Sequence, residues 1–505
     1  MARSGCGKGV EWVEVAVTIP MLDKLPSRPA IRVYTFPMSS PLPHAPGTTL
    51  APWLLALAAL VPLTGCSGDQ PARRPNIVLV TIDTLRADRV DSMGFERGLT
   101  PAMDELAAKS AAFRDAITPI ATTGPAHASL FTGLPPRIHG LRWNGNDLAP
   151  DFATLAGLLN DEGYDTAAFV SMPLMLHGMN LGQGFITRSD ISAENDQIRP
   201  GSETNRMAIE WLQQDRDKPY FLWVHYFDVH TPFELTEHAE QHLGDYQGKL
   251  RNGASTHEVQ HMGEPNPKAV PWNDTELTAL GHLYDGGVTT ADALVAELSL
   301  ALGIELGQHK SGKAQPNSKG SGSETVLIVT ADHGELLGEH NHQGHGFQVW
   351  QEALRIPLII HDPSAAPIQI DERVGLMDLF PTVLEFAGLQ SSTATAGRSL
   401  VPAIRGESPL PKTYLAESRT SPGRIQPVAI LKGDLKVVLM GNDAFGFDLS
   451  QDPTEQTRLD IDSSPELTEL AEIARAYEAT GEESTTSEKP SQERLDSLKA
   501  LGYVE

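Results

Sequence analysis

The chain has 505 residues, enough for two or three domains or for one large α/β domain with an appendage. Its 65 acidic against 39 basic side chains give a formal net charge of -26, and since no basic cluster offsets this charge we predict no nucleic-acid partner. The two cysteines, Cys6 and Cys66, exclude a disulfide framework and a cysteine-bound metal cluster.

An apolar run from Trp53 to Leu63 is too short to serve as a permanent membrane anchor. It is typical of a signal peptide, and the sequence LTGC, which ends at Cys66, resembles the bacterial lipobox, where the peptide is cut before the cysteine and the thiol is acylated. The alternative is an ordinary secretory signal with an accidental cysteine. The lipobox predicts an atypical extension and signal peptide at 1–65, a linker at 66–75, and an extracytoplasmic lipoprotein held to the outer membrane, or facing the periplasm, by lipid on Cys66.

Apolar segments then alternate with amphipathic ones. The nearly continuous apolar runs are typical of parallel strands buried on both faces, and we expect strands at 76–82, 166–171, 219–228, 325–332 and 355–362. Helical spacing and end signals predict helices at 101–113, with Thr100 as N-cap, and at 152–163, 203–214, 273–306 and 378–389. This alternation predicts an α/β fold with a mostly parallel central sheet flanked by helices.

The composition also indicates how the chain is divided. We expect a catalytic domain at 76–410 that carries irregular insertions at 235–272 and 309–324, the second rich in Gly, Ser and Lys. From 411 to 505 the pattern changes to a small α+β subdomain, with a hairpin that turns at Gly433 and Asp434 and a charged helical tail.

Three predicted strands run into an acidic residue, namely Asp83, Asp228 and Asp332. Ligands of open parallel sheets bind beyond the carboxyl ends of the strands, so these acids are candidates for one site, although an aspartate after a strand is often only a cap. Asp332 also opens a segment dense in metal-ligating side chains: Asp332, His333, Glu335, Glu339, His340, His342 and His345. A carboxylate with imidazoles is typical of a divalent-metal site, and a solvated polar loop is the alternative.

The segments VLVTIDTLRAD, TTGPAHASLFTGLPPRIHG, ADHGELLGEH, GHG and ALRIPLII occur in this order from Asn76 onward. Together they resemble the sulfatases of the alkaline phosphatase superfamily. The resemblance implies an alkaline-phosphatase-like sandwich and a metal held by Asp83, Asp332 and His333. It also implies that the side chain of Thr123 is the nucleophile and a further metal ligand, with His345 near the leaving group. Two carboxylates and one imidazole leave Ca, Mn and Zn open.

The chain departs from the sulfatase pattern at the nucleophile. Sulfatases carry Cys or Ser, which is oxidised to formylglycine, and an Arg four residues later, whereas this chain has Thr123 and His127. Threonine cannot form that aldehyde, so we expect no formylglycine. Thr123 resembles instead the threonine nucleophiles of phosphodiesterase and phosphotransferase branches of the superfamily. Thr84 is a second departure, because many sulfatases have another aspartate ligand there.

The remaining candidates surround this centre. Thr123 is expected at a helix N-terminus, which attracts an oxyanion. His127 is either a hydrogen-bond donor to that anion or a structural residue. Asp228 and His230 would complete a second metal site with His345, or His230 would contact the substrate anion. Glu335, Glu339, His340 and His342 are expected to support the ligands.

These observations predict an extracytoplasmic, metal-dependent hydrolase that cleaves a small anionic sulfate or phosphate ester with Thr123 as nucleophile. The first alternative is a phosphodiesterase or phosphotransferase of the same superfamily. The second is an inactive binding protein with this fold, for which Thr84 and Thr123 leave room.

Overall fold

The computed structural model describes residues 74–172, 174–189, 198–255, 272–307, 324–390, 395–407, 412–418 and 426–479. All of them belong to one compact unit, Asp69–Glu505. The predicted signal peptide with Cys66, most of the 309–324 insertion and the tail from 480 lie outside the described residues. Within the described ranges, every helix is too short or too polar to cross a bilayer.

The central sheet has nine strands in the order β10-β2-β9-β6-β1-β5-β3-β4, with β11 also paired to β2. Their bounds are β1 (Asn76–Ile82), β2 (Ala111–Ile117), β3 (Asp165–Val170), β4 (Thr187–Arg188), β5 (Tyr220–Tyr226), β6 (Thr325–Ala331), β9 (Arg355–His361), β10 (Ile368–Ile370) and β11 (Val374–Gly375). Only β9 runs against the others in this sheet as described. Every residue of β1 and β5 is buried, which explains their apolar sequences and confirms the mostly parallel α/β sheet.

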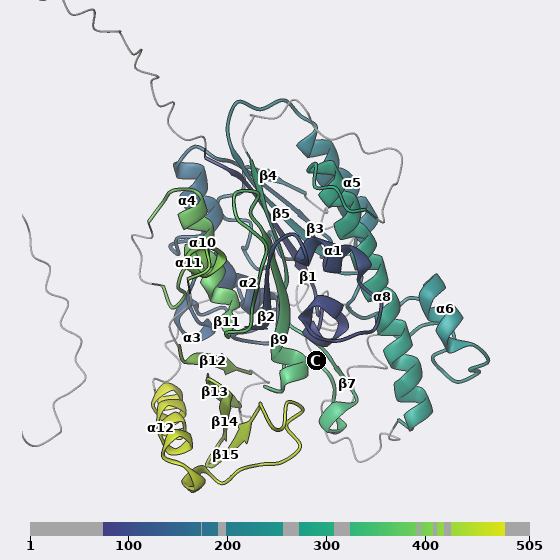
Figure 1. The fold of residues 1–505 in the computed structure, drawn as a ribbon, viewed down its shortest axis with the longest axis vertical. Coiled ribbons are helices and arrows are strands. Elements are labelled where there is room, and N and C mark those ends of the chain that lie inside the picture. Colours follow the sequence, from purple (N-terminus) through teal and green to yellow (C-terminus); the bar gives the residue numbers. More distant parts are fainter. Residues whose placement is uncertain are drawn as a thin grey trace, which may run out of the picture. The chain divides into compact units, whose positions relative to one another are not determined.

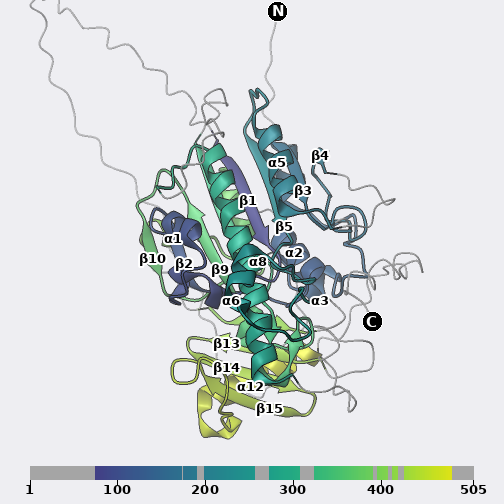
Figure 2. The same ribbon diagram turned by 90° about the vertical axis from the view of Figure 1, so that its right-hand side faces the viewer.

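Helices cover both faces of this sheet, as Figures 1 and 2 show. One layer, built around the long helix α8, consists of α1 (Pro101–Ala107), α5 (Gly201–Leu212), α6 (Glu237–Leu243) and α8 (Asp274–Ala301). The other consists of α2 (Thr123–Thr132), α3 (Pro136–His139), α4 (Leu155–Asp161), α10 (Leu379–Phe386) and α11 (Val401–Ile404). Helix α6 lies inside the segment 235–272 that we expected to be irregular, because Thr236 caps it and Ala239 and Leu243 are buried.

The C-terminal part forms a second, antiparallel sheet in the order β12-β13-β14-β15. Its elements are β12 (Tyr414–Glu417), β13 (Val428–Lys432), β14 (Leu435–Met440), β15 (Asp443–Asp448) and α12 (Pro465–Ala479), the helix that packs on β13 and β14. Lys432 pairs with Leu435, so the hairpin turns at Gly433 and Asp434 as predicted. Short elements complete the fold: η1 (Ala87–Arg89), η2 (Asp91–Met93), β7 (Leu336–Leu337), η3 (Glu339–Asn341), β8 (Gln343–Gly344), α9 (Gln351–Leu354), η4 (Leu376–Asp378) and η5 (Ile461–Ser463).

The predicted helix at 101–113 is wrong in its second half. Helix α1 ends at Ala107, and the alanine-rich segment from Ala111 is strand β2, which pairs with β9 and β10. Alanine favours a helix locally, but pairing with strands on both sides outweighs that preference. Thr100 does not cap α1 with its side chain. Instead the carboxylate of Asp292, on α8, accepts hydrogen bonds from the amides of Ala102 and Met103 at 3.0 and 2.8 Å.

We expect Asp292→Ala to lower the free energy of unfolding by about 2 kcal/mol, because two buried amides lose a charged acceptor. Asp292 is 2% exposed, so water cannot easily replace it. Urea denaturation would measure the change. Asp274→Ala, an exposed aspartate on the same helix, is the control and should cost less than about 0.5 kcal/mol. Equal losses in the two variants would refute the capping role.

Candidate active site

Three neighbouring strands end at one edge of the central sheet. β1 lies between β6 and β5, and Ile82 at its end pairs in register with Ala331 and Tyr226. Asp83 follows β1 directly, and Asp332 with His333 follows β6. The sequence separation of about 250 residues therefore closes to direct contact at the carboxyl edge, where parallel sheets bind their ligands.

The side chains of Asp83, Asp332 and His333 form a compact, fully buried group. One ligand atom from each lies within 4.8 Å of the others. His333 Nε2 is 3.8 Å from Asp83 Oδ1 and 3.5 Å from Asp332 Oδ2. Ligands of a tetrahedral ion at about 2.1 Å stand about 3.4 Å apart, so the group is compact enough to hold one divalent cation.

Thr123 is the first residue of α2 and points into this group. Its Oγ1 lies 3.3 Å from His333 Nε2, and the side chain is completely buried. His333 Nδ1 faces the carbonyl of Gly334 at 2.9 Å, which fixes the proton there and leaves Nε2 as a lone pair toward Thr123 and the carboxylates. Thr123 therefore stands beside His333, one of the three residues that could hold a metal ion.

The start of α2 differs from the expected open anion site in one respect. The amide of Gly124 already donates to Asn144 Oδ1 at 2.8 Å, and Pro125 has no amide hydrogen. A side chain at position 124 would also collide with Met179. The helix dipole remains, but the amides of the first turn are largely used inside the protein.

Thr84, in place of the expected sulfatase aspartate, has a left-handed backbone with φ of 58°. This conformation is costly for a β-branched residue. It aims the Thr84 amide at Asp332 Oδ1, 3.2 Å away, while its carbonyl accepts a 2.6 Å hydrogen bond from the hydroxyl of Tyr284. The strained residue thus orients the carboxylate of Asp332.

Burial shifts the pKa values of the buried acid and the buried histidine in opposite directions, and both shifts favour the neutral form. Burial and the neighbouring charge of Asp83 raise the pKa of Asp332 to about 7, so two carboxylates side by side need a cation to be ionised together. Burial, helped by the charge of His345, lowers the pKa of His333 to about 4. His333 is therefore neutral at physiological pH, which is the state that binds a metal.

His345 behaves differently, because Glu335 lies beside it. Burial lowers its pKa, but the charge and hydrogen bond of the Glu335 carboxylate, 3.2 Å from Nδ1, outweigh burial and raise it. The ring of His345 lies 4.5 Å from the ring of His333 and 5.0 Å from that of His230, centroid to centroid. Glu335 thus supports His345 as expected, and His230 stands at the same centre.

His127 takes the structural alternative. Trp223 donates to Thr81 Oγ1, the Thr81 hydroxyl donates to His127 Nε2, and His127 Nδ1 donates to the carbonyl of Thr123, all at 2.8 or 2.9 Å. Both ring nitrogens of His127 form hydrogen bonds inside the protein, one with Thr123 and one with Thr81. The expectation that His127 binds the substrate anion is therefore not supported. Its role is to position the first turn of α2.

Asp228 is not brought to the centre, which corrects its prediction as a metal ligand. β5 ends at Tyr226, two residues before the end of the strand that we expected at 219–228, so Asp228 lies beyond the strand. Its carboxylate accepts from the amide of Gly201 at the start of α5, 3.2 Å away. It belongs to none of the potential metal groups among the described residues.

His225, on β5, is a site residue that we did not predict. Its Nε2 lies 3.4 Å from Asp83 Oδ2, and it forms a second potential ligand group with His127 and Asp332. Among the described residues neither of its ring nitrogens has a hydrogen-bond partner. The sequence signal that could have indicated this site residue is a histidine inside an otherwise apolar buried strand.

The family model for Sulfatase matches residues 75–303 and 315–389. An arylsulfatase from Clostridium perfringens is 23% identical, over 76% of this chain and 90% of its own. A phosphonate monoester hydrolase from Agrobacterium radiobacter superposes with a TM-score of 0.60 at 21% identity, covering 81% of this chain and 94% of its own. A structure solved with its substrate D-glucosamine-2-N,6-O-disulfate superposes with a TM-score of 0.62 at 19% identity, covering 83% of this chain and all of the other.

The family model spans most strands of the central sheet and includes Asp83, Asp332 and His333 at the strand ends. The family model alone covers more than half of the 505 residues, and the solved structures share the fold. The chain therefore belongs to the Sulfatase family of ester-bond hydrolases.

Proposed function

We propose that this protein is a metal-dependent hydrolase that cleaves sulfate or phosphate esters with the hydroxyl of Thr123 as nucleophile. The observation that carries the proposal is the 3.3 Å separation of Thr123 Oγ1 from His333 Nε2, inside the group formed with Asp83 and Asp332. A hydroxyl that only capped α2 would have no reason to contact an imidazole that itself lies beside two carboxylates.

Asp83, Asp332 and His333 would hold a divalent ion, and the donor set fits one. Asp332 Oδ2 is buried without a hydrogen-bond partner among the described residues, and a cation would satisfy it. A divalent ion at this group supplies positive charge that lowers the pKa of an adjacent hydroxyl and neutralises the charge of the ester. Ca, Mn and Zn all accept these ligands.

The chain's own residues divide the remaining work. Thr123 Oγ1 gives its proton to solvent water, and the alkoxide attacks the phosphorus or sulfur, which forms a threonyl ester and breaks the bond to the leaving oxygen. His345, kept protonated by Glu335, gives that oxygen its proton. Water then hydrolyses the threonyl ester. His230, whose ring lies 5.0 Å from that of His345, would contact the anion.

Residue chemistry favours phosphorus within this proposal. A formylglycine hydrate releases sulfate by deprotonating its second hydroxyl, and threonine has no second hydroxyl. The ester on Thr123 must be broken by water at the central atom, as in the threonine phosphodiesterases and phosphotransferases that Thr123 resembles. Because the chain is similar both to an arylsulfatase and to a phosphonate monoester hydrolase, the test includes sulfate and phosphate esters.

The test is hydrolysis of an aryl sulfate, an aryl phosphate monoester and an aryl phosphodiester by the purified chain from Ser67, with Ca, Mn or Zn. We expect a phosphoester to give the highest kcat/KM. Turnover of the sulfate alone would overturn the preference for phosphorus. Absence of turnover together with tight binding of these esters would favour the inactive binding protein instead.

Glu335→Gln tests the assignment of His345 as the proton donor. In the parent protein the pKa of His345 is raised, so the donor is lost, and kcat falls, as pH rises through that pKa. Without the carboxylate, burial dominates and the pKa drops, so the alkaline limb should move to lower pH and kcat at pH 8 should fall about tenfold or more. A pH profile of kcat at saturating metal measures the shift.

Glu339→Gln is the matched control, because Glu339 lies four residues away and pairs with Arg86 instead. Its alkaline limb should stay where it is in the parent. If both variants keep that limb unchanged, His345 is not the group that limits activity at high pH.

The location of the protein is a separate part of the proposal. The apolar run before Cys66 supports export and acylation, which would place the catalytic domain outside the cytoplasm on a lipid tether. Metabolic labelling with a fatty acid, in the parent and in Cys66→Ser, would test it. Equal labelling of the two proteins would exclude the lipobox.

A further inference from the structure

A second group of metal-ligating side chains lies where the segment after His333 meets the C-terminal sheet. His340 comes from the turn η3, Glu352 from α9 and Glu455 from the loop after β15. One ligand atom from each lies within 4.8 Å of the others. None of the three belongs to the group at Asp83, Asp332 and His333.

The facing atoms of this group are buried and lack hydrogen bonds. The side chains of His340 and Glu352 are 9% and 10% exposed, and Glu455 is fully buried. Within the described residues, neither His340 Nε2 nor Glu352 Oε2 has a hydrogen-bond partner. Buried polar atoms are nearly always paired, so these two point to a missing partner between them.

The distance between His340 Nε2 and Glu352 Oε2 fits a metal ion as the missing partner. His340 Nε2 and Glu352 Oε2 are 3.4 Å apart. A direct bond between an imidazolium and a carboxylate is shorter, about 2.7–2.9 Å. Two ligands of a tetrahedral ion at about 2.1 Å are about 3.4 Å apart, which matches the observed distance.

The surroundings fix the ligands in place. The ring of His340 stacks on Trp350, with centroids 4.1 Å apart and planes inclined by 13°. Glu455 Oε2 accepts from the amide of Gln351 at 2.7 Å, and Glu455 Oε1 lies 2.5 Å from Lys436 Nζ. Two carboxylates and one ammonium leave one negative charge, which the imidazole of His340 faces.

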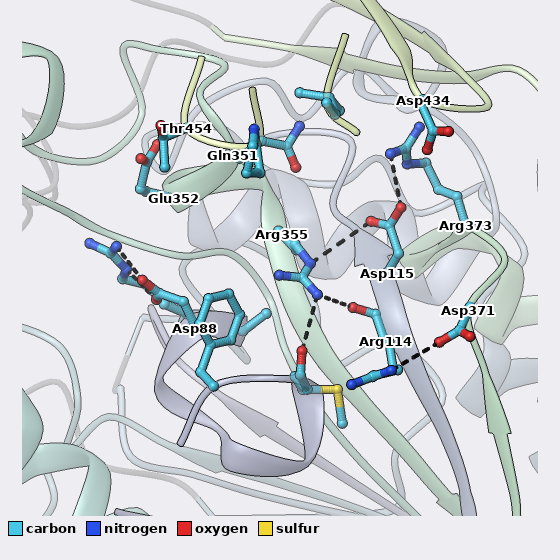
Figure 3. Close-up of a pocket in the computed structure, with 16 residues that line it drawn as sticks. Asp88, Arg114, Asp115, Gln351, Glu352, Arg355, Asp371, Arg373, Asp434 and Thr454 are labelled. Atoms are coloured by element: carbon cyan, nitrogen blue, oxygen red, sulfur yellow. Dashed lines mark hydrogen bonds and ion pairs between the residues drawn. The ribbon is translucent and has the colours of Figure 1, made fainter. Parts of the chain in front are cut away.

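We propose that His340, Glu352 and Glu455 bind a second divalent cation of the zinc class, distinct from the ion of the catalytic group. One imidazole with two carboxylates suits zinc and leaves a fourth position for water. A pocket of about 460 Å³, lined in part by Glu352 and Thr454, adjoins this group on the side of Glu352. Glu352 and Thr454 lie together on one side of this pocket, away from Asp115 and Arg373 (Figure 3).

The bound ion would join the segment that follows β6 to the C-terminal subdomain. His340 lies in the segment that carries His333 and His345, and Glu455 follows the last strand of the C-terminal sheet. The neighbouring Glu339 already holds Arg86 at 2.7 Å, so the segment is tied on one side to the start of the catalytic domain. The cation would tie it on the other side to the C-terminal sheet.

The experiment measures zinc in the chain from Ser67 after saturation with zinc and desalting, by elemental mass spectrometry against protein concentration. We expect His340→Gln and Glu352→Gln each to bind one equivalent less than the parent. Asp332→Asn, which breaks the other group, should keep the equivalent that His340→Gln loses. His361→Gln, a half-buried histidine on β9 outside both groups, is the control and should match the parent.

The inference fails if the parent and both variants bind the same number of zinc ions, which is the result expected if His340 is simply protonated. If His340→Gln does not fold by circular dichroism, Glu352→Gln carries the comparison, because it keeps the shape of the side chain. A parent that binds no zinc beyond the equivalent lost in Asp332→Asn also overturns it. Loss of hydrolysis alone would bear on the proposed function and not on this site.

Discussion

Replacing Thr123 by alanine is expected to lower kcat/KM by about a thousandfold or more, since the attacking oxygen is removed while the fold is kept. Thr123→Ser keeps the hydroxyl and should retain most of the activity. Initial rates on the best of the three aryl esters would measure both variants. Peptide mass spectrometry of quenched turnover should find a phosphate or sulfate ester on residue 123 in the parent.

Thr122→Ala is the control for this experiment. Thr122 is the neighbouring hydroxyl, it immediately precedes α2, and its side chain makes no capping hydrogen bond there. Its variant should stay within a few fold of the parent. Should Thr123→Ala also stay within tenfold of the parent, another nucleophile is at work and the proposed mechanism is wrong.

Asp332→Asn is expected to abolish activity, again by about a thousandfold or more, and to remove one equivalent of bound metal. Asparagine keeps an oxygen for the amides of Thr84 and His333, which now donate to Oδ1, so the backbone should not move. Elemental analysis and rates measure the two losses. Retention of both metal and activity would exclude Asp332 as a ligand.

The same variant should be more stable than the parent when metal is absent. The pKa of Asp332 rises from an ordinary value of 3.8 to about 7 in the folded chain, so the folded state binds more protons than the unfolded state between these values. Stability of the metal-free parent therefore falls as pH rises from about 4 to about 7 and stays low above, by a few kcal/mol at most.

Thermal unfolding at pH 8 tests this sign. In a chelator Asp332→Asn should have the higher Tm, and in excess metal the parent should, because only the parent gains the binding energy of an ion held by Asp83, Asp332 and His333. At pH 4 in chelator the difference should vanish. A parent that is the more stable at pH 8 in chelator would show that Asp332 carries no buried, uncompensated charge.

The proximity of Asp83, Asp332 and His333 was predictable because these residues come from the most regular part of the sequence. Asp83 and Asp332 follow long apolar runs, and the carboxyl ends of parallel strands meet at one edge. The position of Thr123 at the start of a helix was predictable from the glycine and proline that follow it. These features are local, so they survive without knowledge of tertiary contacts.

The predictions differ from the structure where contacts between residues distant in sequence determine the local structure. Ala111 and Ala112 favour a helix until β9 and β10 pair with them. Asp83 follows β1 directly, whereas Asp228 stands two residues beyond the end of β5, and its carboxylate accepts a hydrogen bond from the amide of Gly201. His225 was overlooked because the apolar residues around it indicate a strand and give no hint that its ring meets Asp83.

Residue 84 is coupled to the centre through its backbone. Its amide meets Asp332 and its carbonyl meets Tyr284, whereas its hydroxyl donates to the adjacent carbonyl of Asp83. The side chain can thus be exchanged without disturbing what its peptide groups hold. An acidic residue at position 84 would therefore change the charge of the pocket while the peptide groups that hold Asp332 and Tyr284 stay in place.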